Sequence, residues 1–304
     1  MPVSLRHRWI YRLLGGAAPY LLHLRPLEWP IMAAHTLLGY GLAVGLTGLA
    51  AGTARSDALL GLLLWVVCLN GGTLAINSAF DNDEGDIAYL REPPKPPRHL
   101  FAWGLGLMLL GQALSLLLPP SFSLVYALCF LMSVLYSVPP ARLKAVAGAD
   151  WVINMWGFGT FTPFAGWAST GRSLDFSHAI VLLGFCPLFA ALYPLTQIYQ
   201  LEEDSRRGDR TLVIRLGVGR SLAVAIGAAL LAFGFFFWSL VILGRTDPLR
   251  LIALAAALGA WLLVLVPWAR DHAKRSTAEH QRGMYFALAA WAVTDLVVLV
   301  AWGA

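Results

Sequence analysis

Charged residues are scarce in this sequence of 304 residues: they make up 13% of it, against about a quarter in typical soluble proteins. Hydrophobic residues make up 58%, and the mean hydropathy is +0.67. This composition excludes an ordinary soluble domain. Because about 20 apolar residues cross the hydrocarbon core of a bilayer as a helix, the long uncharged runs predict an all-α, polytopic membrane protein.

Cysteine is also scarce, which removes two further classes. Cys68, Cys129 and Cys186 lie in separate apolar runs and form no C-x-x-C pair. A disulfide framework and a zinc site are therefore excluded, and the cysteines are interpreted as small apolar side chains. The basic first residues lack a clear short apolar segment with a cleavage site, so residues 1–30 are expected to be a cytoplasmic or interfacial lead-in rather than a signal peptide.

Apolar runs separated by turn-forming residues indicate nine membrane spans in a single domain, residues 1–304. The expected spans are 31–52, 58–80, 100–118, 121–138, 151–168, 177–199, 221–243, 249–269 and 283–302. When the connecting loops are assigned to alternate sides, 18 of the 22 lysines and arginines fall on the side of the N-terminus. This bias places the N-terminus and the basic loops in the cytoplasm, as in a bacterial-type inner membrane. The net charge of +5 then reflects topology and contact with anionic membrane lipid, and it does not indicate nucleic-acid binding.

The acidic residues are concentrated as well. Nine of the 17 lie in two loops of the same side, within "NSAFDNDEGDIAYLRE" (77–92) and "QLEEDSRRGD" (200–209). Four carboxylates in the six positions 81–86 repel one another unless water or a metal ion screens them. Each loop also has an amide four residues before an aspartate, Asn77 with Asp81 and Gln200 with Asp204. Residues at this spacing share a helix face, so each pair is expected to project from the cytoplasmic end of a span toward one place.

Two carboxylate patches beside arginines and lysines, above an apolar bundle, suit Mg²⁺ that bridges a diphosphate. Two simpler interpretations stay open for the residues alone. Short charged loops are often only solvated connectors. Residues 81–92 also partly match a calcium-binding EF-hand loop, although Gly85 is one position early and no soluble helix pair flanks the loop.

Four landmarks show that the sequence resembles the UbiA superfamily of intramembrane prenyltransferases over nearly its whole length. They are "LRPLEWP" (24–30), "NSAFDNDEGD" (77–86), "YSVPPARLK" (136–144) and "QLEEDSRRGDRTLVIRLG" (200–217). The sequence departs from the family pattern in three places. Ser78 and Gln200 stand where aspartates are common, and the last aspartate of the first motif is displaced by one position to Asp86.

The resemblance implies a nine-helix bundle whose central cavity opens to cytoplasmic loops, and an enzyme that is Mg²⁺-dependent. The enzyme would transfer a polyprenyl group from an isoprenoid diphosphate to an aromatic or lipid acceptor. The implied catalytic residues are Asp81, Asp204 and Lys144, and the implied metal ligands are Asp81, Asp86, Asp204 and Asn77. The implied substrate-binding residues are Asn77, Gln200, Arg142, Arg210, Tyr136, Ser137, Asn154 and Tyr193.

A carbocation also needs a dry cavity with aromatic faces, for which the candidates are Phe80, Trp151, Trp156, Phe158 and Tyr193. Two other functions stay open. A terpene cyclase of the same superfamily would act on the diphosphate without an acceptor, and a transporter would need ionisable or helix-breaking residues at mid-membrane depth. Asp295 is the one carboxylate in the middle of an expected span, and His35 is either a cavity residue or a hydrogen-bonded structural histidine. The acceptor and the prenyl chain length have no motif.

Overall fold

The structure is a computed structural model that describes residues 7–50, 56–81, 90 and 92–303. Within these ranges every regular element is a helix. The helices are α1 (Arg8–Leu14), α2 (Ala18–His23), α3 (Trp29–Ala50), α4 (Ser56–Leu63), α5 (Gly72–Asp81), α6 (Leu100–Ser115), α7 (Pro120–Ser137), α8 (Ala149–Asn154), α9 (Thr162–Ala168), α10 (Phe176–Ile198), α11 (Leu201–Arg207), α12 (Leu212–Leu216), α13 (Val218–Ile242), α14 (Pro248–Asp271) and α15 (Thr277–Gly303). Short 3₁₀ turns cover Gly15–Ala17, Leu143–Ala145 and His272–Lys274.

Seven helical stretches in the described ranges are long and apolar enough to cross a membrane. One of them, Asp57–Asp81, comprises α4, a π-helical segment and α5. Helix α6 is apolar but shorter, and α8 and α9 are joined by a π-helical segment, Met155–Phe161. A second π-helical segment, Leu64–Gly71, joins α4 to α5. The all-α membrane fold is thus confirmed, whereas the count of nine spans stays a prediction.

The helix ends agree with local chemistry. The Asp175 side chain accepts a hydrogen bond from the backbone N–H of His178 at the start of α10, and Asp247 does the same for Arg250 in α14. These are N-caps, which satisfy N–H groups that the first turn leaves unpaired. The expected span 100–118 is shorter in the structure, because α6 ends at Ser115 and the chain turns before two consecutive prolines.

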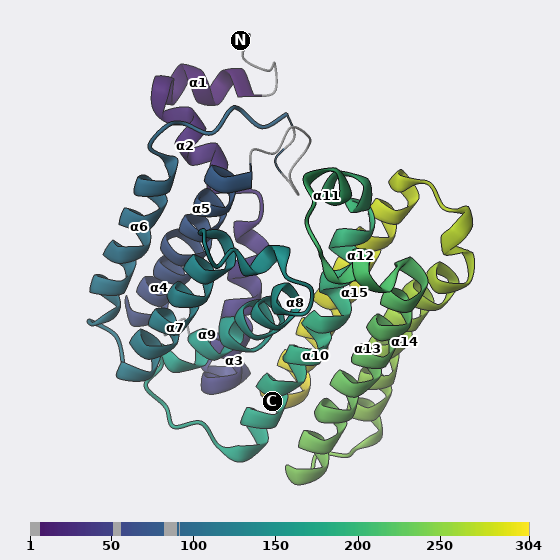
Figure 1. Cartoon of the computed structure of the whole chain (residues 1–304). Helices are drawn as coiled ribbons and strands as arrows, with labels where there is room; N and C mark the ends of the chain where they lie inside the picture. The colour runs from purple at the N-terminus through teal and green to yellow at the C-terminus, as the bar shows by residue number, and fades with distance from the viewer. Residues whose placement is uncertain (1–6, 51–55, 82–89, 91, 304) are drawn as a thin grey trace.

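The helices form a bundle in which α6 and α14 lie at opposite edges (Figure 1). Small residues allow the closest contacts. A Cβ atom on Gly39 of α3 would lie 1.6 Å from the carbonyl oxygen of Pro163 in α9, and one on Gly166 would lie 1.8 Å from that of Thr36. Only glycine lets the two backbones approach so closely, as in other packed membrane helices.

The end of the lead-in enters the bundle. Leu24 is buried with Ala75 and Leu100 in one apolar cluster, and His23 Nε2 lies 3.1 Å from the carbonyl oxygen of Pro94. The turn that follows α2 therefore packs against α5 and α6. Arg25 is buried and Glu28 half-buried on this turn, whereas Leu27 is exposed. Helices α1 and α11 and the connection between α14 and α15 lie at the same end of the bundle (Figure 1).

Candidate active site

A cavity of about 380 Å³ lies between the helices, and residues of the expected site line it. Its polar lining consists of Arg25, Glu28, Asn70, Thr73, Asn77, Asp81, Ser133, Tyr136, Lys144, Asn154, Thr162, Tyr193, Thr196, Gln197, Tyr199, Gln200, Asp204, Asp209, Thr211 and Tyr285. Apolar side chains such as Trp65, Leu69, Met132 and Phe189 line the remainder. The cavity thus combines a charged part with space for a hydrocarbon chain.

Lys144 is the centre of the charged part. Its Nζ donates a hydrogen bond of 2.8 Å to Asn77 Oδ1 and forms an ion pair with Asp81. Ser137 Oγ donates to the same Asn77 oxygen at 3.2 Å. Lys144 is only 9% exposed. A buried ammonium group needs such carboxylate and amide partners, because burial without them is costly.

Arg142 connects the two acidic patches. Its guanidinium lies 3.9 Å from Asp81 and 3.1 Å from Asp209, which follows the second motif. Arg142 has a φ of 36°, in the left-handed region, and the 3₁₀ turn Leu143–Ala145 follows it directly. The loop conformation therefore presents Arg142 and Lys144 to the same carboxylate.

A second set of contacts fixes the loop that carries the second motif. The backbone N–H of Arg210 donates to the carbonyl oxygen of Ala145 at 3.3 Å. Asp150 is fully buried and accepts hydrogen bonds from Gly148 N (2.8 Å) and Gln197 Nε2 (2.7 Å). The side-chain oxygen Oε1 of Gln197 in turn accepts a hydrogen bond from the backbone N–H of Val213 at 3.4 Å. These bonds hold the basic loop and the second acidic loop together.

The second pair, Gln200 and Asp204, differs in detail from the expectation. Helix α10 ends at Ile198, and Gln200 is the N-cap residue of the separate short helix α11. The pair is therefore not on the end of the sixth expected span, although both residues line the same cavity as Asn77 and Asp81. Asp204 is 5% exposed.

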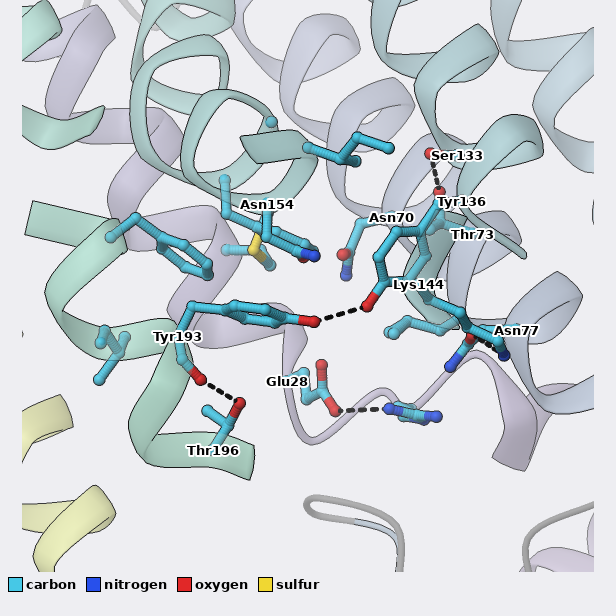
Figure 2. A pocket seen from close by; sticks show the side chains of 18 of the residues that line it. Glu28, Asn70, Thr73, Asn77, Ser133, Tyr136, Lys144, Asn154, Tyr193 and Thr196 are labelled. Atoms are coloured by element: carbon cyan, nitrogen blue, oxygen red, sulfur yellow. Dashed lines mark hydrogen bonds and ion pairs between the residues drawn. The ribbon is translucent and has the colours of Figure 1, made fainter. Parts of the chain in front are cut away.

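Tyrosine and phenylalanine rings form one wall. Tyr136 and Tyr193 share a hydrogen bond of 2.8 Å between their hydroxyl oxygens, and both point into the cavity (Figure 2). Phe189 stacks on Tyr193 and on Phe158, with ring centroids 6.3 Å and 5.3 Å apart. Asn154 also lines the cavity and donates a hydrogen bond to the carbonyl oxygen of Asp150.

Other candidates lie elsewhere. The side chain of Arg210 is exposed and does not line the cavity. Phe80 packs on Phe101, and Trp151 and Trp156 are not cavity-lining residues either. Asp86 lies outside the described residues.

His35 and Asp295 form a pair away from the cavity lining. His35 Nδ1 lies 3.1 Å from the Asp295 carboxylate, and Nε2 lies 3.2 Å from the carbonyl oxygen of Gly159. His35 is thus a hydrogen-bonded histidine, and Asp295 is its partner.

With this geometry in view, the comparison with known families is decisive. The model of the UbiA prenyltransferase family matches residues 36–291. This chain belongs to the UbiA prenyltransferase family. Among curated proteins, none matches the sequence.

Solved UbiA structures share the fold of this UbiA family member. A UbiA homologue from Archaeoglobus fulgidus bound to GPP and Mg²⁺ is 17% identical, with a TM-score of 0.66 over 93% of this chain and 99% of that one. The same homologue bound to DMAPP and Mg²⁺ gives a TM-score of 0.66 over 92% and 99%. A digeranylgeranylglyceryl phosphate synthase gives 0.68 at 16% identity, over 93% of this chain and 97% of that one.

The sequence did not predict a site role for three of the cavity residues, Asp209, Glu28 and Asn70. Asp209 was visible only as part of the second acidic loop, and its pairing with Arg142 depends on two loops far apart in the chain. Glu28 lies within the landmark "LRPLEWP" and Asn70 lies outside all four landmarks, and both line the cavity. For Asn70 a signal was present, because it lies seven residues before Asn77 and so on the same face of one helix.

Proposed function

We propose that this UbiA family member transfers a polyprenyl group from an isoprenoid diphosphate to an aromatic or lipid acceptor within the membrane. One observation carries the proposal. Asp81, at the end of α5, and Asp204, in α11, are more than 100 residues apart in sequence and line the same cavity, and Asp81 forms an ion pair with Lys144. The apolar part of that cavity suits a hydrocarbon chain, and the charged part suits its diphosphate.

The donor set also fits magnesium. Among the described residues no three His, Cys, Asp or Glu side chains cluster closely enough to hold a metal ion by themselves. Mg²⁺ in proteins is usually held by one or two carboxylates together with substrate phosphates and water. Asp81 and Asp204 would hold it, with Asn77 and Gln200 as neutral oxygen donors, and Asp86 is a further proposed ligand outside the described residues. When bound, Mg²⁺ would neutralise charge on the leaving diphosphate.

The chain's own residues would do the remaining work. Lys144 and Arg142 would bind diphosphate oxygens, with Ser137 and Asn77 orienting the Lys144 ammonium group. The Tyr136–Tyr193 pair and the stacked rings of Phe158 and Phe189 would exclude water and offer π faces to an allylic cation. Arg210, on the exposed loop that follows α11, would be a further diphosphate contact.

We also propose that the protein lies in a bacterial-type inner membrane with its N-terminus and the active-site loops in the cytoplasm. The excess of lysine and arginine on that side supports this orientation.

Purified protein in nanodiscs with labelled geranyl, farnesyl and geranylgeranyl diphosphates provides the test. A prenylated product that depends on both Mg²⁺ and an added acceptor is the expected result, read by mass spectrometry. Asp81→Asn and Asp204→Asn are each expected to lower turnover by about 100-fold or more. Glu279→Gln is the control, because Glu279 is exposed and bonded to Ser276 away from the cavity. Wild-type turnover in both aspartate variants would contradict the proposal.

A further inference from the structure

A second pocket lies at the connection between α14 and α15, and none of its described lining residues lines the cavity of the candidate active site. Its larger side chains are Asp271, Lys274, Arg275, Glu279, Arg282 and Phe286. Helices α14 and α15 are both long and apolar enough to cross a membrane, and the pocket lies where the first ends and the second begins. This connection is at the same end of the bundle as α1 and α11 (Figure 1). The pocket therefore lies at the boundary between hydrocarbon and water.

Arg275 is held at this pocket by a buried ring. Its guanidinium carbon lies 5.8 Å from the centroid of the Trp268 ring, which is a cation–π contact. Trp268 is fully buried, and its Nε1 donates a hydrogen bond of 2.8 Å to His280 Nδ1. Gly283 leaves room for the ring, since a Cβ atom there would lie 2.6 Å from it. Trp268 thus joins α14 to α15 and fixes the place of the Arg275 charge.

The three basic side chains of the pocket form no ion pair and no hydrogen bond with other described residues. They are Lys274, Arg275 and Arg282. Arg250 of α14 shows the contrast, because it pairs with Asp247 at 2.6 Å. The N–H donors of a guanidinium group lie in its own plane, so a contact with a ring face does not occupy them. The pocket therefore keeps its donors for a ligand or for water.

Two carboxylates also line the pocket, and they limit the charge of the ligand that would suit it. Glu279 Oε2 accepts hydrogen bonds from the backbone N–H and the hydroxyl of Ser276, at 2.7 Å and 2.8 Å. Asp271 is the last residue of α14. Three positive and two negative side chains leave a net charge of +1. A phosphodiester carries a single negative charge and would neutralise the pocket, whereas a diphosphate would leave excess negative charge.

An exposed apolar side chain continues the pocket toward the hydrocarbon core. Phe286 is 63% exposed and lies four residues after Arg282 on α15. Residues at this spacing share a helix face, so Phe286 lies on the membrane side of Arg282, about 6 Å further along the helix. A ligand that has both a phosphate group and an acyl chain would contact both side chains. A free phosphate ion would contact only the basic ones.

We propose that this pocket binds the headgroup of an anionic phospholipid, through a phosphodiester group of the kind that phosphatidylglycerol carries. Arg275 and Arg282 donate hydrogen bonds to the phosphate oxygens, and Lys274 adds positive charge. Phe286 contacts the start of an acyl chain. Basic pockets between membrane helices on the cytoplasmic side bind such headgroups in other membrane proteins. The site goes beyond the proposed function, because its residues lie outside the cavity in which prenyl transfer is proposed.

Lipid binding by the whole chain tests the proposal. The protein is purified in detergent, stripped of lipid and titrated with the dioleoyl forms of phosphatidylglycerol, phosphatidylethanolamine and phosphatidylcholine. Native mass spectrometry counts the lipid molecules that each protein molecule retains. We expect phosphatidylglycerol to bind at one site, about tenfold more tightly than either zwitterionic lipid. The triple variant Lys274→Gln, Arg275→Gln and Arg282→Gln should lower this affinity by about 10- to 100-fold.

Two further variants separate the pocket from general effects of charge. Arg8→Gln, Arg12→Gln and Arg220→Gln together remove the same charge from exposed positions outside the pocket, so this control should bind phosphatidylglycerol like the wild type. Phe286→Ala keeps every charge and should weaken binding of phosphatidylglycerol by about fivefold. Circular dichroism shows whether each variant keeps its helices. Because Phe286 is exposed, its variant provides the test even where the triple variant does not fold.

Any of five results would overturn the assignment. They are equal affinity for the three lipids, wild-type affinity in a folded triple variant, wild-type affinity in Phe286→Ala, an equal loss of affinity in the control variant, and displacement of bound lipid by millimolar inorganic phosphate. The last result would assign the pocket to a free phosphate ion. Since the titration needs neither a prenyl diphosphate nor an acceptor, each of these results leaves the proposed prenyl transfer standing.

Discussion

Lys144 contacts two side chains of the first motif at once, which makes it the residue on which we expect diphosphate binding to depend most. Replacing it by methionine keeps much of the side-chain volume but removes the charge next to Asp81 and Asn77. A charge-assisted hydrogen bond is worth about 1.5–3 kcal/mol, so Lys144→Met should weaken binding of farnesyl thiolodiphosphate by about 10- to 100-fold. Isothermal titration in detergent measures this.

Lys274→Met is the matched control, because Lys274 is exposed in the connection between α14 and α15, away from this cavity. Equal affinity in Lys144→Met and Lys274→Met would remove Lys144 from the site.

Residue spacing in the sequence predicted part of this arrangement. The amide-to-aspartate spacing indicated that Asn77, Asp81, Gln200 and Asp204 share one place, and all four line one cavity. Spacing along the chain carries no information about the distance between loops. The pairing of Arg142 with Asp209 therefore had no signal, and the exposed position of the Arg210 side chain had none either.

At the scale of elements, His35 joins three helical segments that are distant in sequence. It lies in α3, and its ring nitrogens approach Asp295 of α15 and the carbonyl oxygen of Gly159 in the π-helical segment Met155–Phe161. Its ring also packs edge-on against Phe185 and Trp291. Because no cavity-lining role accompanies these contacts, we interpret the pair as structural.

A single variant and the corresponding double variant test this interpretation. His35→Leu leaves the Asp295 carboxylate without its partner in an apolar region, which should cost about 3–5 kcal/mol of unfolding free energy. His35→Leu combined with Asp295→Leu removes both polar groups and should recover most of that loss. Denaturation in mixed detergent micelles, followed by circular dichroism, gives the values. A double variant as unstable as His35→Leu would show that the carboxylate is not the source of the cost.

Hydrophobic runs predicted the elements well but not their internal irregularity. The expected span 177–199 corresponds to α10 (Phe176–Ile198). The expected span 221–243 begins inside α13 (Val218–Ile242) and ends one residue after it. The π-helical segments could not be predicted from the sequence. A π-helical turn contains one more residue than an α-helical hydrogen-bonded turn, and this extra residue does not interrupt the run of hydrophobic residues. They matter at the site, because Asn70 lies on one of them and Phe158 on the other.

For the whole molecule, the charge bias makes a prediction about orientation. The described helices place α1, α11 and the α14–α15 connection at one end of the bundle (Figure 1), and this is the end that carries most of the lysines and arginines. The positive-inside rule assigns it to the cytoplasm. The loop between α9 and α10 should then face the opposite compartment.

Single cysteines in exposed loop positions test this orientation. Ala273→Cys lies in the α14–α15 connection and Ser173→Cys in the α9–α10 loop, and both positions are exposed. An impermeant maleimide should label Ser173→Cys in intact cells and Ala273→Cys only in inverted vesicles. The wild type supplies the background, because Cys68, Cys129 and Cys186 are buried. The reverse pattern would place the acidic motifs outside the cell, where the proposed cytoplasmic diphosphate has no access to Lys144. Labelling of both variants from one side would contradict the placement of the two loops at opposite ends of the bundle.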